Sequence, residues 1–144
     1  IPYGPRMRPE LVIPRFVGMA RDGEPITVHG DGTQFRNYLY IDDLVDGHLR
    51  ALGSPGENQV FNLEGSEAVS VRQLVEQIQH VLDRPVAVAF GPSRRGDYGG
   101  RRVSSAKAGR ALHWVPEVPF GEGLRRYVAW LEAEAEGAGM ATEG

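Results

Sequence analysis

Residues 30–43 constrain the fold of this chain more than any other stretch, because a turn, a strand and the start of a helix follow one another there. Gly30 and Gly32 permit backbone angles that a side chain would forbid, and an Asp lies between them. Residues 35–41 are mostly aromatic or branched, which favours a strand. Asp42 can then accept N–H bonds in the first turn of a helix. The sequence therefore predicts a turn–strand–helix unit with Asp42 as the helix cap.

Arg36 is the charged residue of the predicted strand, and two interpretations of it stay open. A guanidinium behind a glycine-rich turn is well placed to hold a phosphate or carboxylate through paired hydrogen bonds. The alternative is a charge that keeps an edge strand soluble. The residues alone favour the second interpretation.

Composition limits the classes of function. The 144 residues suggest one compact domain, and the formal net charge of −3 gives no support to nucleic-acid binding. With no Cys in the sequence, disulfides and thiol catalysis are excluded. There is no apolar run near the roughly 20 residues that cross a bilayer, and no signal peptide, so we expect a cytoplasmic protein with no membrane partner.

The remaining pattern predicts an α/β chain of short strands and several helices. Ser70-Val71-Arg72-Gln73 has the form of a capping box at the start of a helix. Short strands are expected at 25–29, 60–63 and 85–90, and helices are expected to begin near Pro14, Asp42, Ser70, Ser104 and Phe120. In the helix after Asp42, helical spacing predicts that Val45, Leu49 and Leu52 line one apolar side.

Residues 91–102 form a glycine-rich loop with four Arg, which is either a solvated basic loop or an anion site. No His, Cys, Asp or Glu cluster has metal-ligand spacing, so no metal site is expected.

The segment 30–43 resembles the G-D-G-x-Q-x-R-D motif region of the extended short-chain dehydrogenases/reductases, which are NAD-dependent nucleotide-sugar epimerases, dehydratases and decarboxylases. Asn37 stands where the motif has Asp. The first residues are similar to the N-x-Y-G-P-R-M of UDP-glucuronate decarboxylases, with Ile1 at the position of the substrate-contacting Asn. UDP-glucose 4-epimerases are also close in pattern.

The resemblance implies four substrate-binding residues. Arg36 and Arg94 would hold the diphosphate of a UDP- or dTDP-sugar from two separate elements. Asp97 would bind the nucleotide ribose, and His29 would lie beside the uracil or thymine base. Near the C-terminus, Ser104 to Trp114 resembles the D-x-S-K-A-x-x-x-L-G-W of the family, with His113 in place of Gly.

The sequence lacks the cofactor-binding and catalytic motifs of the family. There is no G-x-G-x-x-G after a strand and no Tyr-x-x-x-Lys pair, so no catalytic residue is assigned. We expect residues 1–131 to form the C-terminal substrate-binding region, without the Rossmann half, and residues 132–144 to fray. NAD would act in the full-length parent, and this fragment would bind no cofactor.

Two functions are compatible with these observations. The first is the nucleotide-sugar-binding half of an NAD-dependent epimerase, dehydratase or decarboxylase, which is not catalytic alone. The second is a stand-alone, non-catalytic module for nucleotide-sugar binding or protein interaction. In either case, uncovered apolar surface predicts either association with a missing N-terminal Rossmann half or self-association, for example as a dimer.

Overall fold

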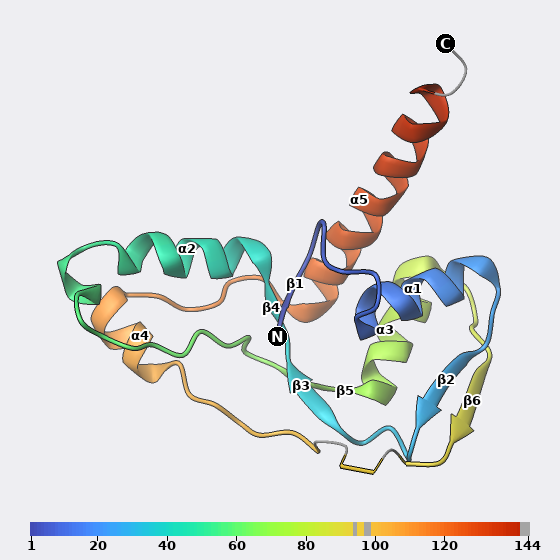
Figure 1. Ribbon diagram of the computed structural model, residues 1–144, viewed down its shortest axis with the longest axis horizontal. Helices are drawn as coiled ribbons and strands as arrows, with labels where there is room; N and C mark the ends of the chain where they lie inside the picture. The colour runs from blue at the N-terminus through green and yellow to red at the C-terminus, as the bar shows by residue number, and fades with distance from the viewer. Residues whose placement is uncertain (94, 97–98, 142–144) are drawn as a thin grey trace.

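The structure is a computed structural model that describes residues 1–93, 95–96 and 99–141 (Figure 1). Within these residues it is a mixed α/β fold of five α-helices, one short 3₁₀ helix and six short strands. In chain order they are β1 (Pro2–Tyr3), α1 (Val12–Asp22), β2 (Ile26–His29), β3 (Phe35–Asn37), β4 (Leu39–Tyr40), α2 (Ile41–Ala51), η1 (Ser54–Gly56), β5 (Ala68–Ser70), α3 (Val71–Leu82), β6 (Val88–Gly91), α4 (Ala106–Leu112) and α5 (Phe120–Ala141).

The strands pair two by two in the described residues. β1 runs parallel to β4, and β2 runs parallel to β6 with Ile26 opposite Val88. β3 and β5 are antiparallel, with Arg36 opposite Val69. The strand predicted over 35–41 is therefore split at Tyr38, and its two parts join different partners. The strand predicted at 60–63 is not formed.

The main core lies where α1, α3 and the first half of α5 pack against the paired strands β1 and β4. Its centre is aromatic: the rings of Tyr3 and Tyr40 meet edge to face with centroids 5.5 Å apart, and Tyr38 packs against Phe120 at 5.2 Å. The Tyr3 hydroxyl donates to the Phe120 carbonyl at 3.0 Å. Side chains from α1, α3 and α5 complete this core, including Ile13, Val17, Leu74, Ile78 and Leu124.

A smaller second core lies between α2 and α4. Trp114 is fully buried there with Leu39 and Leu112, and its indole N–H donates to the Asp43 carbonyl at 2.9 Å. His113, which ends α4, has a φ of 53°, so a non-glycine residue occupies the left-handed region. The segment therefore packs as part of the second core.

One helix start follows the sequence prediction and another does not. Both hydrogen bonds of the predicted capping box form between Ser70 and Gln73. The prediction that Asp42 caps α2 is wrong, because the helix begins at Ile41 and its N-cap is Tyr40, two residues before Asp42, without a side-chain bond. Asp43 rather than Asp42 is turned inward, where its Oδ2 accepts from the Val118 N–H at 3.0 Å.

The predicted apolar side of α2 faces solvent instead of the core. Val45, Leu49 and Leu52 are 49%, 62% and 83% exposed. The helix approaches the second core through Gly47, where an added Cβ would lie 2.6 Å from Leu63. Leu44 and Ala51, on the same side as Gly47, pack against the second core, whereas Val45, Leu49 and Leu52 remain uncovered.

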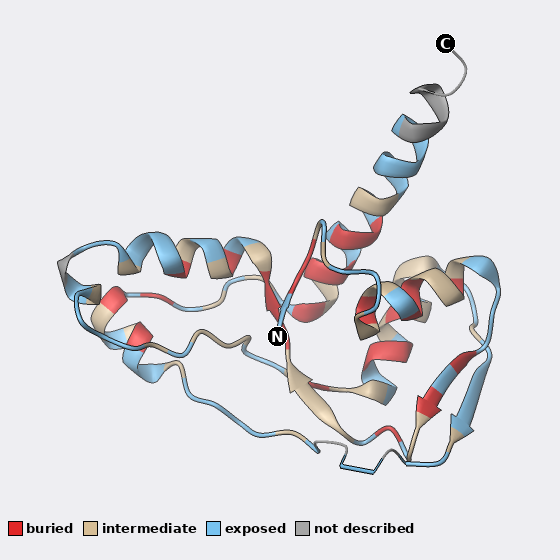
Figure 2. Cartoon of the chain, in the orientation of Figure 1, coloured by how far each residue is buried: buried red, intermediate tan, exposed pale blue. Residues whose placement is uncertain are grey.

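Helix α5 extends out of the body of the protein, and its second half is mostly exposed (Figures 1 and 2). It runs without interruption through the predicted boundary between residues 131 and 132. In the described residues, no helix combines the length and apolar character needed to cross a bilayer.

Candidate functional site

The turn between β2 and β3 is built around Asp31. Its Oδ1 accepts hydrogen bonds from the Thr33 backbone N–H at 2.9 Å and from the Thr33 hydroxyl at 2.7 Å. These two bonds, the backbone bond first, lower the pKa of Asp31. Gly30 and Gly32 have φ of 73° and 75°, the left-handed geometry for which glycine is needed. The predicted turn is confirmed, and its shape depends on both glycines.

The start of α3 holds this turn from the other side. The Val71 N–H donates to the Gln34 carbonyl at 3.1 Å, and the Arg72 N–H donates to the Gly32 carbonyl at 3.2 Å. N–H groups at a helix start have no partner within the helix. Here these two are used to fix the turn, so β5 and α3 act as its support.

A cavity of about 950 Å³ opens beside the turn, at the carboxyl ends of the parallel strands β2 and β6. Open parallel strands commonly bind ligands at this end. The lining comes from the turn, from the start of β3 and from the loop after β6: His29, Gly30, Asp31, Thr33, Gln34, Phe35, Phe90, Gly91, Pro92, Ser93, Gly96 and Gly99. We call this the turn cavity.

His29, one of the predicted substrate-binding residues, lines the turn cavity. Its Nδ1 lies 3.3 Å from the Pro92 carbonyl, and its own carbonyl accepts from the Gln34 amide at 3.0 Å. The ring is therefore anchored between β2 and the loop after β6. Its predicted place beside a nucleotide base remains a prediction.

Arg36 lies on β3, next to the turn cavity. The side chain is half-buried, and its guanidinium donates to the Phe35 carbonyl at 2.7 Å. Phe35 itself lines the cavity, and alternation along the strand turns Arg36 to the other side of β3. Burial raises the pKa of Tyr38 to about 12, and the charge of Arg36 partly offsets this effect.

Arg94 and Asp97, the other two predicted substrate-binding residues, lie outside the described residues. Described residues of the same loop line the turn cavity: Ser93 precedes Arg94, Gly96 precedes Asp97, and Gly99 lies two positions after Asp97. The Phe35 N–H donates to the Gly99 carbonyl at 2.9 Å, so the loop after β6 returns to the start of β3. The described structure thus brings His29, the start of β3 and this loop into one region, with Arg36 following directly on β3.

Sequence reasoning did not find Gln34 or Phe90 as cavity residues. The signal was available, because Gln34 belongs to the G-D-G-x-Q pattern and Phe90 ends a predicted strand. Parallel pairing of that strand with β2 could not be read from the pattern, and this pairing puts Phe90 at the cavity.

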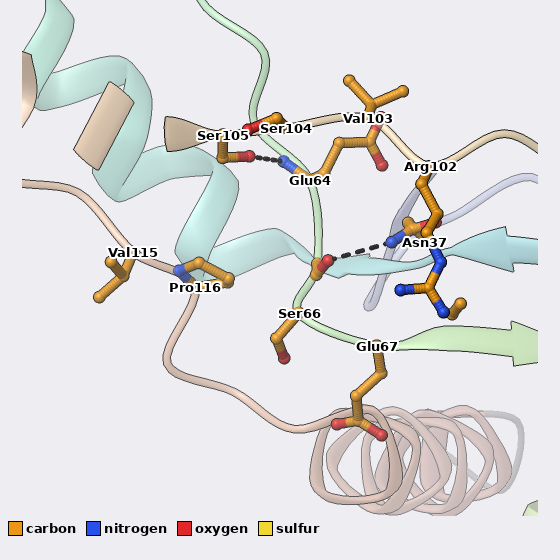
Figure 3. A pocket seen from close by; sticks show the side chains of 12 residues that line it. Asn37, Glu64, Ser66, Glu67, Arg102, Val103, Ser104, Ser105, Val115 and Pro116 are labelled. Carbon is orange, nitrogen blue, oxygen red and sulfur yellow. Dashed lines mark hydrogen bonds between the residues drawn. The ribbon is translucent and has the colours of Figure 1, made fainter. Parts of the chain in front are cut away.

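A second cavity, of about 770 Å³, lies at the Asn37 end of β3 (Figure 3). Asn37 and Arg102 lie on one side of it, and Val115 and Pro116 lie opposite. The Asn37 amide donates to the Gly65 carbonyl at 3.3 Å, whereas its buried Oδ1 has no hydrogen-bond partner within the described residues. Asn37 is the position where the family motif has Asp.

The described residues contain no strand–turn–helix unit of the kind that holds a dinucleotide. Such a site needs a parallel strand, a glycine-rich turn and a helix in succession. Here the glycine-rich turn after β2 leads into another strand, and β4 leads into α2 without a glycine between them. No group of three or more His, Asp or Glu that could hold a metal ion occurs in the part of the chain that the structure describes.

Comparison with known proteins points to the family whose motifs the sequence resembles. Residues 2–63 match the NAD dependent epimerase/dehydratase family. The chain is 32% identical over 135 residues to UDP-glucuronate 4-epimerase of Thermodesulfobacterium geofontis, covering 93% of this chain and 42% of that protein. The chain is related to the extended short-chain dehydrogenases/reductases. It is also 35% identical to UDP-glucuronic acid decarboxylase 1 of Arabidopsis thaliana, covering 88% of this chain and 29% of the relative.

Solved structures of this family share the fold. The structure of UDP-glucose 4-epimerase from Thermotoga maritima with UDP-glucose has a TM-score of 0.84 and 30% identity, covering 93% of this chain and 44% of that one. The expected resemblance and α/β fold are thus confirmed. The chain spans less than half the length of the enzymes that it matches.

Proposed function

We propose that this chain is the nucleotide-sugar-binding portion, from the C-terminal half, of an NAD-dependent epimerase, dehydratase or decarboxylase. The observation that carries the proposal is the meeting of three segments at the turn cavity: β2 with His29, the start of β3 before Arg36, and the loop on either side of Arg94 and Asp97. Two guanidinium groups from separate elements can neutralise a diphosphate, which carries more charge than one Arg can offset.

The chain alone would bind the substrate without converting it. Hydride transfer in this family uses NAD, and the described residues lack the unit that holds a dinucleotide. The tyrosines of the core are also unsuited to proton transfer, because burial raises the pKa of Tyr38 to about 12. What this portion contributes is the position and charge of its own side chains around the nucleotide.

The partner of this portion is proposed from its uncovered surface. Val45, Leu49 and Leu52 form an exposed apolar stripe on α2, and the buried parallel pair β1–β4 contains only two residues in each strand. Parallel strands normally lie inside larger sheets covered on both faces. Since the relatives are more than twice as long, we propose that the part of the enzyme not matched here, the Rossmann half, covers this surface.

Calorimetric titration with UDP tests the binding role. The wild-type chain is expected to bind, and Arg36→Ala is expected to weaken binding by roughly ten- to hundredfold, because a hydrogen bond to a charged group contributes about 1.5–3 kcal/mol. Arg110→Ala, which removes an exposed Arg from α4, is the matched control and should bind like wild type.

Two results would remove the proposal. One is an absence of heat with the wild-type chain at millimolar UDP. The other is equal affinity of wild type and Arg36→Ala, which would assign Arg36 to the solubility of β3. If UDP binds but with no dependence on Arg36, the alternative of a stand-alone nucleotide-binding module with a different site gains support.

A further inference from the structure

Arg72 has no role in the family motifs quoted above, yet it is the residue of α3 that contacts the turn most extensively. Its Nε donates to the Asp31 carbonyl, and its backbone N–H donates to the Gly32 carbonyl at 3.2 Å. The aliphatic part of the side chain lies directly against the turn, since a Cβ added to Gly32 would be 2.9 Å from the Arg72 Cγ. One residue thus holds two successive carbonyls of the turn.

The guanidinium of Arg72 also lies over Phe90. Its Cζ is 5.5 Å from the centre of the ring, a cation–π distance. Phe90 is 59% exposed and lines the turn cavity, so its ring has few neighbours to fix its orientation. Arg72 therefore connects two walls of the cavity, the Gly30–Gln34 turn and the end of β6.

The geometry suits Arg and not Lys. A planar guanidinium can donate from Nε along one edge while its face covers an aromatic ring, whereas an ammonium offers no such plane. The positive charge also favours the ionised form of Asp31, after the two larger contributions from Thr33. That form accepts both hydrogen bonds that shape the turn.

We propose that Arg72 is a positioning residue of the nucleotide site, which sets the geometry of the turn cavity by holding the turn and Phe90 together. This inference rests on the proposed function for the identity of the ligand. The contact of Arg72 with the turn does not depend on the proposed function, and its effect on the turn can be measured without ligand.

The test uses Arg72→Met, Arg72→Lys, Phe90→Leu and the double variant Arg72→Met with Phe90→Leu in the full chain. Arg84→Met, at the exposed far end of the same α3 region, is the matched control. UDP affinity is measured by calorimetry, and amide hydrogen exchange is measured without ligand at Thr33, Val71 and, as an internal reference in the core, Tyr127.

We expect Arg72→Met and Arg72→Lys each to weaken UDP binding by about five- to tenfold, with Arg84→Met unchanged. Exchange at Thr33 and Val71 should become at least about threefold faster in both variants, while exchange at Tyr127 stays the same. The double variant should bind no more weakly than the weaker single variant, because both changes break the same connection.

Recovery of wild-type affinity by Arg72→Lys would overturn the proposal, because it would assign the effect to charge alone. Unchanged exchange at Thr33 and Val71 in Arg72→Met would also overturn it. If the wild-type chain does not bind UDP, the proposed function fails, and the exchange rates alone then decide whether Arg72 holds the turn.

Discussion

Gly123 determines the packing at the centre of this protein, because it lies against Tyr3. Gly123 is on α5, and a Cβ at this position would lie 2.1 Å from the Tyr3 hydroxyl oxygen and 2.8 Å from the ring of Tyr40. The missing side chain lets α5 approach the aromatic cluster closely enough for Tyr3 to donate to the Phe120 carbonyl. Helix propensity alone would disfavour glycine here.

Gly123→Ala is therefore expected to destabilise the protein by about 1–3 kcal/mol, because the added methyl group overpacks a closed core. Urea unfolding followed by circular dichroism measures the change. Gly137→Ala in the same helix is the matched control: nothing lies within 4 Å of its Cβ position, so the change should be neutral or stabilising by up to about 1 kcal/mol. Equal effects of the two substitutions would contradict the packing described here.

Tyr38 gives a prediction for pH. Burial raises its folded pKa to about 12 from an ordinary value of 10.0. Above pH 10 the unfolded chain loses this proton while the folded chain keeps it, so the stability that is fully present below pH 10 is lost as pH rises toward 12. Between pH 9 and 11 the loss from Tyr38 should be about 1 kcal/mol.

Urea unfolding of wild type and Tyr38→Phe at pH 9 and pH 11 tests this. The variant should lose less stability over the interval by about that amount, since its side chain does not ionise. An identical loss in both proteins would mean that Tyr38 titrates normally in the folded state.

At the scale of elements, sequence patterns predicted correctly the features that depend on residues close together in the chain. The capping box of Ser70 and Gln73 and the glycine-rich turn were predicted because each is satisfied by hydrogen bonds between residues close in sequence. The pairing of β2 with β6 joins residues about 60 positions apart, and no local pattern indicates it. For the same reason, the turn cavity could be assigned residue by residue only through the family resemblance.

Helix α2 shows the limit of periodicity. The spacing of Val45, Leu49 and Leu52 correctly indicated one apolar side, but periodicity does not say what covers it. In this chain the covered side is instead the one with Gly47, next to Leu63 and Trp114. The error in assigning Asp42 as cap has a related cause, because Asp43 is held by a contact with Val118, 75 residues away.

The exposed stripe of α2 predicts that the isolated chain self-associates. Leu49→Ser together with Leu52→Ser should shift the protein toward monomer in sedimentation velocity at micromolar concentration, with a stability cost below about 1 kcal/mol, because both side chains are already mostly exposed. Val115→Ser, at another exposed apolar position, is the control and should leave association unchanged. A wild-type chain that stays monomeric throughout would contradict the prediction.

At the scale of the whole molecule, the main core and α3 hold the Gly30–Gln34 turn in place. The main core fixes β4 and α3, α3 fixes the turn, and the turn leads into the strand that carries Arg36. The apolar stripe of Val45, Leu49 and Leu52 remains exposed. This division fits a portion of a larger enzyme in which one side meets the nucleotide and another meets the remaining part.

The most direct test of this account is a crystal structure of the chain with UDP, in which the distances from the guanidinium groups of Arg36 and Arg94 to the diphosphate oxygens are measured. The account predicts both distances at about 3 Å, with the base beside His29 in the turn cavity. A diphosphate bound elsewhere, or the two guanidinium groups on opposite sides of an otherwise unchanged fold, would contradict it.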